Sequence, residues 1–181
     1  MKYSLIFSLL FFSNLLFSQD IFLGAKFGLN LSQVNSEVIQ NLEQKTGFHA
    51  GITSEFSFTE FLSIQSELLY STQGASNRYL DLSMNYLSIP VLVKVYPVEN
   101  FSLDIGPQLS FLLSNKAVFY GINIETESYE DVDFGLAAGV TYKSRFDVYA
   151  QARFVYGVTE FDNSGKSKNQ VFQFSLGYNF L

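Results

Sequence analysis

The sequence predicts an all-β protein, an eight-stranded antiparallel up-and-down transmembrane β-barrel preceded by a cleavable signal peptide. Three observations lead to this fold class. Apolar and polar residues alternate with period 2 in eight segments, which is typical of strands with one apolar face. The links between those segments alternate between short and long. The chain also contains 20 Phe and 11 Tyr, and aromatic residues favour strands.

The N-terminus has the layout of a secretory signal. Lys2 precedes a long apolar stretch that ends at Ser18 and Gln19. The alternative is an N-terminal membrane helix, although the apolar run is slightly short for a span. We therefore expect residues 1–19 to be a signal peptide and residues 20–181 to form one outer-membrane β-barrel domain.

The alternation defines each strand in turn. The eight expected strands are residues 21–31, 48–58, 62–70, 86–96, 101–113, 132–142, 146–158 and 171–181. Each of the first three strands has apolar side chains on one face and a charged residue on the other, which is Lys26, Glu55 or Glu67 in turn. The fourth places a row of valines opposite Lys94, and the fifth places a row of leucines and isoleucine opposite Asp104. The last three strands alternate glycine and polar residues with aromatic and aliphatic ones.

The links divide into two kinds. The links near 59–61, 97–100 and 143–145 are short. The long links are polar and carry most of the acidic residues; they are 32–46, 72–84, 114–131 and 159–170. Tilted strands of about 11 residues span roughly 25–28 Å, which matches the hydrocarbon band of an outer membrane. Both termini should then lie on the short-turn side, in the periplasm.

Two observations decide which face meets lipid. A secreted lipocalin-like carrier also alternates, but its water-facing side should be about 25–35% charged, and the polar face here is mostly Gly, Ser, Thr and Gln. Eight large apolar rows would also overfill an eight-stranded interior. We therefore expect the apolar face to contact lipid and the glycine-rich face to line a narrow lumen. Outward aromatics near both strand ends fit two interfacial girdles.

Six charged residues are expected in the lumen. They are Lys26, Glu55, Glu67, Lys94, Asp104 and Arg153. Because eight strands leave no open aqueous channel, we interpret them as a structural polar plug; the alternative is a path for protons or a solute. Pairing 94 with 104 around the turn at 97–100 satisfies the alternation. The sequence therefore predicts that Lys94 is ion-paired in a cluster with Glu67 and Asp104.

Five segments carry recognisable motifs. They are YLSIPVLVKVY (86–96), IGPQLSFLL (105–113), DFGLAAGVTY (133–142), RFVYGVT (153–159) and VFQFSLGYNFL (171–181). In them the chain resembles the PorT-like outer-membrane β-barrel family of Bacteroidota over nearly its whole mature length. The resemblance implies an outer-membrane barrel inserted by the barrel-assembly machinery, which usually reads a terminal aromatic; here Leu181 follows Phe180. One member of the family is linked to type IX protein secretion, but this chain is short for that member.

Few residues point to catalysis or metal binding. His49 is the single histidine, and we expect it to face inward near the extracellular rim, where a hydrolase dyad would need a nearby Ser or Asp. Acidic residues crowd the third long link and its end, a candidate cation-binding loop that could bridge divalent cations to surface lipid. They are Glu125, Glu127, Glu130, Asp131 and Asp133. The net charge of −6 and the lack of a basic patch argue against nucleic acid.

These observations favour a small barrel of the cell outer membrane with a structural or interaction role, no enzymatic activity, no metal site and no cofactor. The expected partners are outer-membrane lipid, lipopolysaccharide, the barrel-assembly machinery during insertion, and an envelope protein that the sequence does not identify. Three alternatives stay open: a lipid-modifying enzyme with a site at the loop rim, a lipocalin-like ligand carrier, and an accessory component of type IX secretion.

Overall fold

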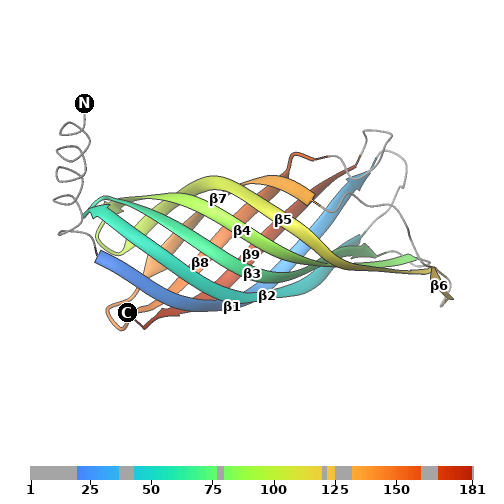
Figure 1. Ribbon diagram of the computed structural model, residues 1–181, viewed down its shortest axis with the longest axis horizontal. Helices are drawn as coiled ribbons and strands as arrows, with labels where there is room; N and C mark the ends of the chain where they lie inside the picture. Colours follow the sequence, from blue (N-terminus) through green and yellow to red (C-terminus); the bar gives the residue numbers. More distant parts are fainter. Residues whose placement is uncertain are drawn as a thin grey trace, which may run out of the picture.

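The computed structural model describes residues 20–36, 43–76, 80–119, 122–124, 132–159 and 167–180. In these residues the chain forms a closed barrel of long antiparallel strands (Figure 1). The expected signal peptide at residues 1–19 lies outside the described residues. No helix in the described part of the chain is long and apolar enough to cross a membrane.

The strands follow one another around the barrel. Their bounds are β1 Asp20–Ser36, β2 Glu43–Thr59, β3 Leu62–Ser76, β4 Leu80–Val98, β5 Phe101–Phe119, β6 Ile122–Ile124, β7 Val132–Lys143, β8 Val148–Gly157 and β9 Ser167–Asn179. Leaving the short β6 aside, each strand pairs with its neighbours in sequence, and β1 pairs with β9 to close the wall. The eight-stranded up-and-down fold is therefore confirmed.

The strands are longer than the alternation predicts at the end opposite the short turns. β1 runs to Ser36, β3 to Ser76 and β5 to Phe119, although the sequence predicted loops from 32, 72 and 114. Backbone pairing of a hairpin can continue where one face is no longer apolar, because the ladder of hydrogen bonds uses main-chain groups. The predicted link 114–131 also contains the three-residue strand β6, which pairs with β5. Figure 1 shows β4, β5 and β6 extending beyond the other strands.

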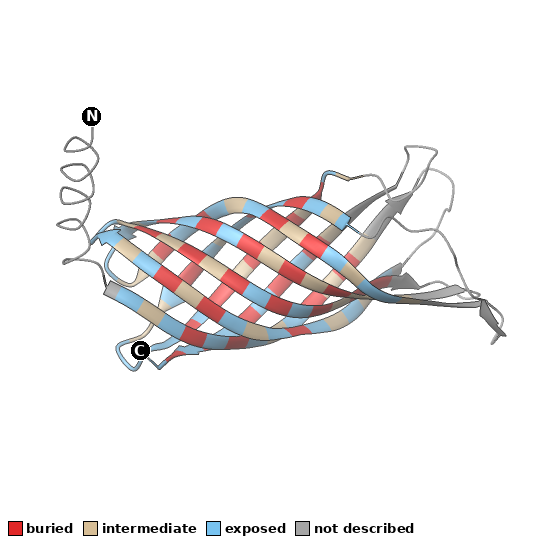
Figure 2. Ribbon diagram, in the orientation of Figure 1, coloured by how far each residue is buried: buried red, intermediate tan, exposed pale blue. Residues whose placement is uncertain are grey.

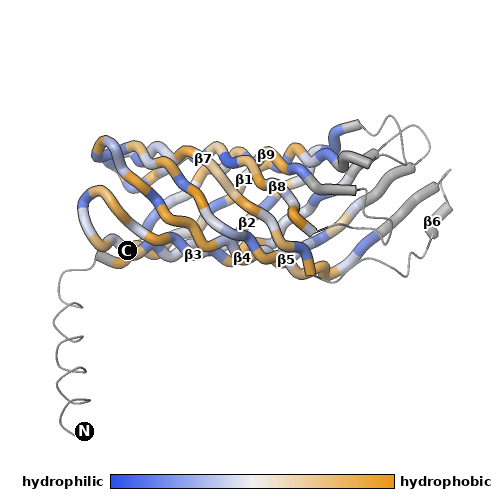
Figure 3. Tube along the Cα trace, turned by 90° about the horizontal axis from the view of Figure 1, so that it is seen from above, coloured by the Kyte–Doolittle hydropathy of each residue, from blue (hydrophilic) through white to orange (hydrophobic). Residues whose placement is uncertain are grey.

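The two faces of the wall have opposite character. Exposed residues alternate with buried or half-buried ones along the strands wherever burial is described, giving the checkerboard of Figure 2, and hydropathy alternates with them in Figure 3. Large outward apolar side chains such as Phe27, Ile105 and Leu136 are exposed, whereas the buried residues are largely polar. The barrel is inverted relative to a soluble protein, and lipid is the solvent that suits its outer face.

Inward glycines give the lumen room for large side chains. A Cβ atom on Gly177 would lie 2.1 Å from Cζ of Tyr149, and one on Gly28 would lie 2.7 Å from Cε1 of His49. The tyrosine and histidine rings therefore occupy the space over these glycines. The prediction that the glycine-rich face lines the lumen is confirmed for these two positions.

Candidate functional site

The six charged residues expected inside the barrel all point into the lumen, and each is at most 8% exposed. We call Lys26, Glu55, Glu67, Lys94, Asp104 and Arg153 the luminal charge cluster. They come from six strands: β1, β2, β3, β4, β5 and β8. Three cations face three carboxylates, so the cluster is formally neutral. Neutrality matters here because an uncompensated buried charge is strongly destabilising.

Glu67 is the centre of this cluster. Its carboxylate accepts two hydrogen bonds from Arg153, with Nη1 to Oε2 at 3.0 Å and Nη2 to Oε1 at 2.6 Å. The Nζ atom of Lys26 lies 2.7 Å from Oε2 of the same carboxylate. The paired arginine contacts have the fork geometry that makes charge-assisted bonds strong and directional. One carboxylate thus pairs with two cations, which come from β1 and β8.

Lys94 pairs with a residue that the sequence did not predict. Its Nζ lies 2.9 Å from Oε2 of Glu55, and it donates a second hydrogen bond of 2.8 Å to Oε1 of Gln65. The predicted backbone register of Lys94 with Asp104 is confirmed, but the predicted Glu67–Lys94–Asp104 cluster is wrong. The long lysine side chain reaches over the neighbouring strand β3, where Gln65 also accepts from it, so its ion partner comes from β2.

Asp104 is held by neutral donors. Ser102 Oγ donates to Oδ1 at 2.6 Å, while Thr141 Oγ1 and Gln151 Nε2 donate to Oδ2 at 2.5 and 2.9 Å. The short aspartate side chain stays near its own strand, where these groups reach it. Ser102 could have been identified from sequence, because residues two apart on a strand share a face.

Two glutamine amides join the parts of the cluster into one network. Gln65 accepts from Lys94 through Oε1 and donates to Glu67 through Nε2. Gln151 accepts from Lys26 and Arg153 through Oε1 and donates to Asp104 through Nε2. Each amide turns its oxygen to cations and its nitrogen to a carboxylate. A hydrogen-bonded path therefore links all six charged residues.

A double-mutant cycle should distinguish the observed ion pair from the predicted one. We expect Lys94→Met and Glu55→Gln to be coupled by at least about 1 kcal/mol in the free energy of unfolding, because the effects of substitutions at the two members of an ion pair do not add. Lys94→Met and Asp104→Asn should couple by less than about 0.5 kcal/mol. Urea titration of protein refolded in lipid vesicles provides the measurement. A larger coupling to Asp104 than to Glu55 would contradict the pairing described above.

His49 lies in a second luminal network, toward the long-link end of the barrel. Its Nδ1 lies 2.7 Å from Oδ1 of Asn30, and its Nε2 lies 2.7 Å from Oγ of Ser175. The Nδ2 group of Asn30 donates to Ser71 and to backbone carbonyls, so its Oδ1 is the acceptor that faces the ring. His49 therefore carries its proton on Nδ1, and Ser175 donates to Nε2.

The order serine, histidine, asparagine is that of a hydrolase triad, but its surroundings differ from those of an active site. His49 is 1% exposed, and Asn30 and Ser175 are also buried. The predicted inward orientation of His49 is correct, but β2 begins at Glu43, six residues earlier, so His49 lies deeper in the lumen than the predicted position near the rim. A substrate would have to enter the packed lumen to reach the serine hydroxyl.

The candidate cation-binding loop falls mostly outside the described residues. Of its five acids, only Asp133 is described, and its Oδ1 accepts a hydrogen bond of 2.5 Å from Thr159. Within the described ranges, no group of three or more His, Cys, Asp or Glu residues is arranged to hold a metal ion.

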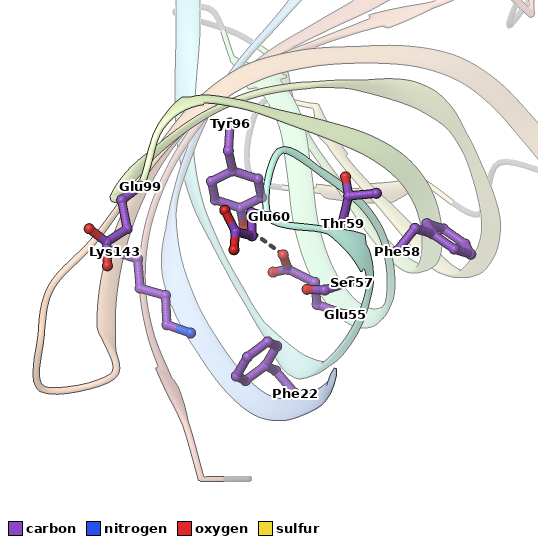
Figure 4. Close-up of a pocket in the computed structure, with 9 residues that line it drawn as sticks. All are labelled: Phe22, Glu55, Ser57, Phe58, Thr59, Glu60, Tyr96, Glu99 and Lys143. Carbon is purple, nitrogen blue, oxygen red and sulfur yellow. Dashed lines mark hydrogen bonds between the residues drawn. The ribbon is translucent and has the colours of Figure 1, made fainter. Parts of the chain in front are cut away.

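The short-turn mouth of the barrel opens into a vestibule of about 410 Å³ (Figure 4). Its inner limit is the hydrogen bond of 2.6 Å from the Tyr96 hydroxyl to Oε1 of Glu55, the residue that pairs with Lys94. Near the mouth, Nζ of Lys143 lies 3.9 Å from the centroid of the Phe22 ring. Toward the other end, a cavity lined by Gln108 and Ser110 measures only about 10 Å³. The charge cluster therefore separates the vestibule from the upper lumen.

Comparison with known proteins places this fold in a family. A family model described as outer membrane protein beta-barrel domain matches residues 17–163. The chain belongs to this family. The apolar outer wall and polar lumen are thus those of an outer-membrane barrel, and the protein is located in the outer membrane. Among curated proteins, none matches the sequence.

Solved structures of small outer-membrane barrels share the fold at low sequence identity. The attachment invasion locus protein Ail of Yersinia pestis is 16% identical with a TM-score of 0.58, covering 88% of this chain and 98% of Ail. Ail in complex with the heparin analogue sucrose octasulfate gives 15% identity, a TM-score of 0.60 and coverage of 89% and 99%. Neisserial surface protein A is 13% identical with a TM-score of 0.59, covering 90% and 99%.

Proposed function

We propose that this protein is a structural and interaction barrel of the cell envelope. Its long links contact partners, and its lumen has no transport role. The observation that carries this proposal is the continuous, charge-balanced luminal network. A network of this kind stabilises a closed wall but offers no ready site for a solute. The strands that extend beyond the barrel at the long-link end supply a base for surface loops.

We further propose that the long links face the cell exterior and that residues 1–19 direct export as a signal peptide. Within the family, the YLSIP and DFG segments support a PorT-like member from Bacteroidota. Insertion would use the barrel-assembly machinery acting on the C-terminal strand β9. Lipid and lipopolysaccharide would contact the outward aromatic rows, since aromatic rings favour the membrane interfaces.

The net charge of the long links restricts which surface charge a partner can have. Links 32–46, 72–84, 114–131 and 159–170 together contain nine acidic and five basic residues. The ligand named for one Ail structure is a polysulfated sugar, and like charges would oppose such a ligand here. We therefore propose a partner with a basic or neutral surface, such as an envelope protein, contacted directly or through divalent cations at the acidic third link.

One experiment compares this role with the alternative of a lipid-modifying enzyme. Intact cells would be treated with a membrane-impermeant cross-linker, and envelope lipids would be profiled in parallel. Replacing residues 120–131 by a short Gly-Ser link should remove a cross-linked partner and leave the lipid profile unchanged. His49→Gln, the matched luminal variant, should keep the partner and the lipid profile.

The opposite result would contradict the proposal. If His49→Gln abolishes a lipid product while the shortened link keeps the partner, the enzyme hypothesis is favoured. As a check that each barrel is folded, both variants should migrate differently on detergent gels before and after heating.

A further inference from the structure

The outer wall carries an apolar groove. It measures about 790 Å³ and crosses β7, β8, β9, β1 and β2. Its floor includes the small side chains of Ala50, Ala150 and Ala152. Large outward residues such as Phe27 and Phe174 form its walls.

The strand register explains why these residues form one continuous groove. Residues Gln151, Ser175, Gly28 and His49 are successive partners across β8, β9, β1 and β2, and their side chains face inward or are absent. The row below them begins at Ala150 and the row above begins at Ala152. Because Ala150 and Ala152 have small side chains, the space between the two rows is deeper at β8. The backbone that forms the floor of this space makes its hydrogen bonds within the sheet.

The dimensions of the groove suit one lipid chain. Four steps between neighbouring strands at about 4.8 Å give a path of about 19 Å from β7 to β2. Because strands of such barrels tilt by about 40°, a path perpendicular to them climbs about 12 Å, roughly half of a 25 Å apolar band. The groove therefore crosses about one leaflet, and it is continuous with the lipid-facing surface of an outer-membrane barrel.

Charge identifies the end at which a head group would lie. The groove begins at Phe101 and Tyr142, beside the short turn 144–147. That turn contains Arg145, which is exposed and forms no ion pair with any described residue, and Asp147, whose carboxylate lies 3.8 Å from Nζ of Lys143. Residues 143–147 therefore carry a net charge of +1. The other two short turns contain Glu60 and Glu99 instead. Arginine matches phosphate by charge and geometry, so an anionic head group fits this turn and not the others.

We propose that this groove is a binding site for one glycerophospholipid of the leaflet on the short-turn side. One acyl chain lies between the rows over Ala150 and Ala152, and the phosphate lies at Arg145 beside the Tyr142 hydroxyl. The exposed ring of Phe146, at 82%, lies next to Arg145 in sequence and suits the same interface. This inference does not depend on the role proposed for the long links.

Native mass spectrometry of the delipidated protein, titrated with phosphatidylglycerol in detergent, tests this proposal. The wild-type protein should retain one phospholipid per chain. Ala150→Phe with Ala152→Phe fills the groove and should weaken retention at least tenfold, whereas Ala25→Phe, an outward alanine of β1 outside the groove, should leave it unchanged. Arg145→Gln should weaken retention severalfold.

Three results would overturn the proposal. Equal retention by the filled variant and the wild type would mean that the groove is not the site, and unaltered binding by Arg145→Gln would remove the head-group assignment. A wild-type dimer that the filled variant breaks would assign the groove to a second copy of the chain. If the double variant fails to show heat-dependent migration, Ala150→Leu alone should still weaken retention.

Discussion

Glu67→Gln should lower the free energy of unfolding by about 3–5 kcal/mol, the range expected when one partner of a buried ion pair is removed. The substitution preserves the size of the side chain but leaves Lys26 and Arg153, both almost fully buried, without their shared carboxylate. The luminal charge cluster would change from three cations and three carboxylates to three and two. Urea-induced unfolding from lipid vesicles measures the loss.

Two further variants separate charge imbalance from lost packing. Adding Lys26→Met to Glu67→Gln returns the cluster to two cations and two carboxylates, so it should recover at least about 1 kcal/mol through coupling of neighbours. Glu60→Gln removes an exposed carboxylate in a short turn and should change stability by less than about 0.5 kcal/mol. A loss below about 1 kcal/mol for Glu67→Gln would mean that water or other groups stabilise the two cations, and that the cluster does not hold the wall together.

Ile105→Arg should destabilise the protein in a bilayer by about 2–4 kcal/mol, the value for a cation on the lipid face near the midplane. Ile105 is 62% exposed on the outer face, four residues above the start of β5. In water, an arginine at such an exposed position would be nearly neutral in its effect. The size of the loss therefore reports what surrounds the outer wall.

The matched control uses the same substitution at the membrane edge. Val98 is 63% exposed but ends β4 beside a short turn, so Val98→Arg should change stability by about 0–1 kcal/mol. Both variants would be unfolded from the same vesicles. Equal effects at the two sites would contradict the depth assigned to Ile105.

The fold could be predicted from the sequence because each short turn fixes the register of its hairpin. The period of 2 assigns every residue to a face, and a register error of one residue would turn apolar side chains into the lumen. This is why the predicted backbone register of Lys94 opposite Asp104 is correct and all six charged residues lie inside. The ends of the long strands and β6 were missed, since backbone pairing beyond the apolar band leaves no alternation in the sequence.

The side-chain partners could not be predicted for a different reason. Lys94 reaches over β3 to Glu55 on β2, and such contacts depend on side-chain length and on the stagger between strands. The network of Asn30, His49 and Ser175 requires the register between β1 and β9, which no turn connects. Only closure of the barrel fixes that register, and closure depends on all the strands together.

We propose that the luminal charge cluster blocks the lumen, so that the protein acts through its surface. Electrical recording of the refolded protein in a planar lipid bilayer tests this claim most directly. The closed network predicts no current steps above those of the detergent blank at any salt concentration. Discrete steps that grow with salt concentration, and that are absent for heat-denatured protein, would establish an open path through the lumen and contradict the claim.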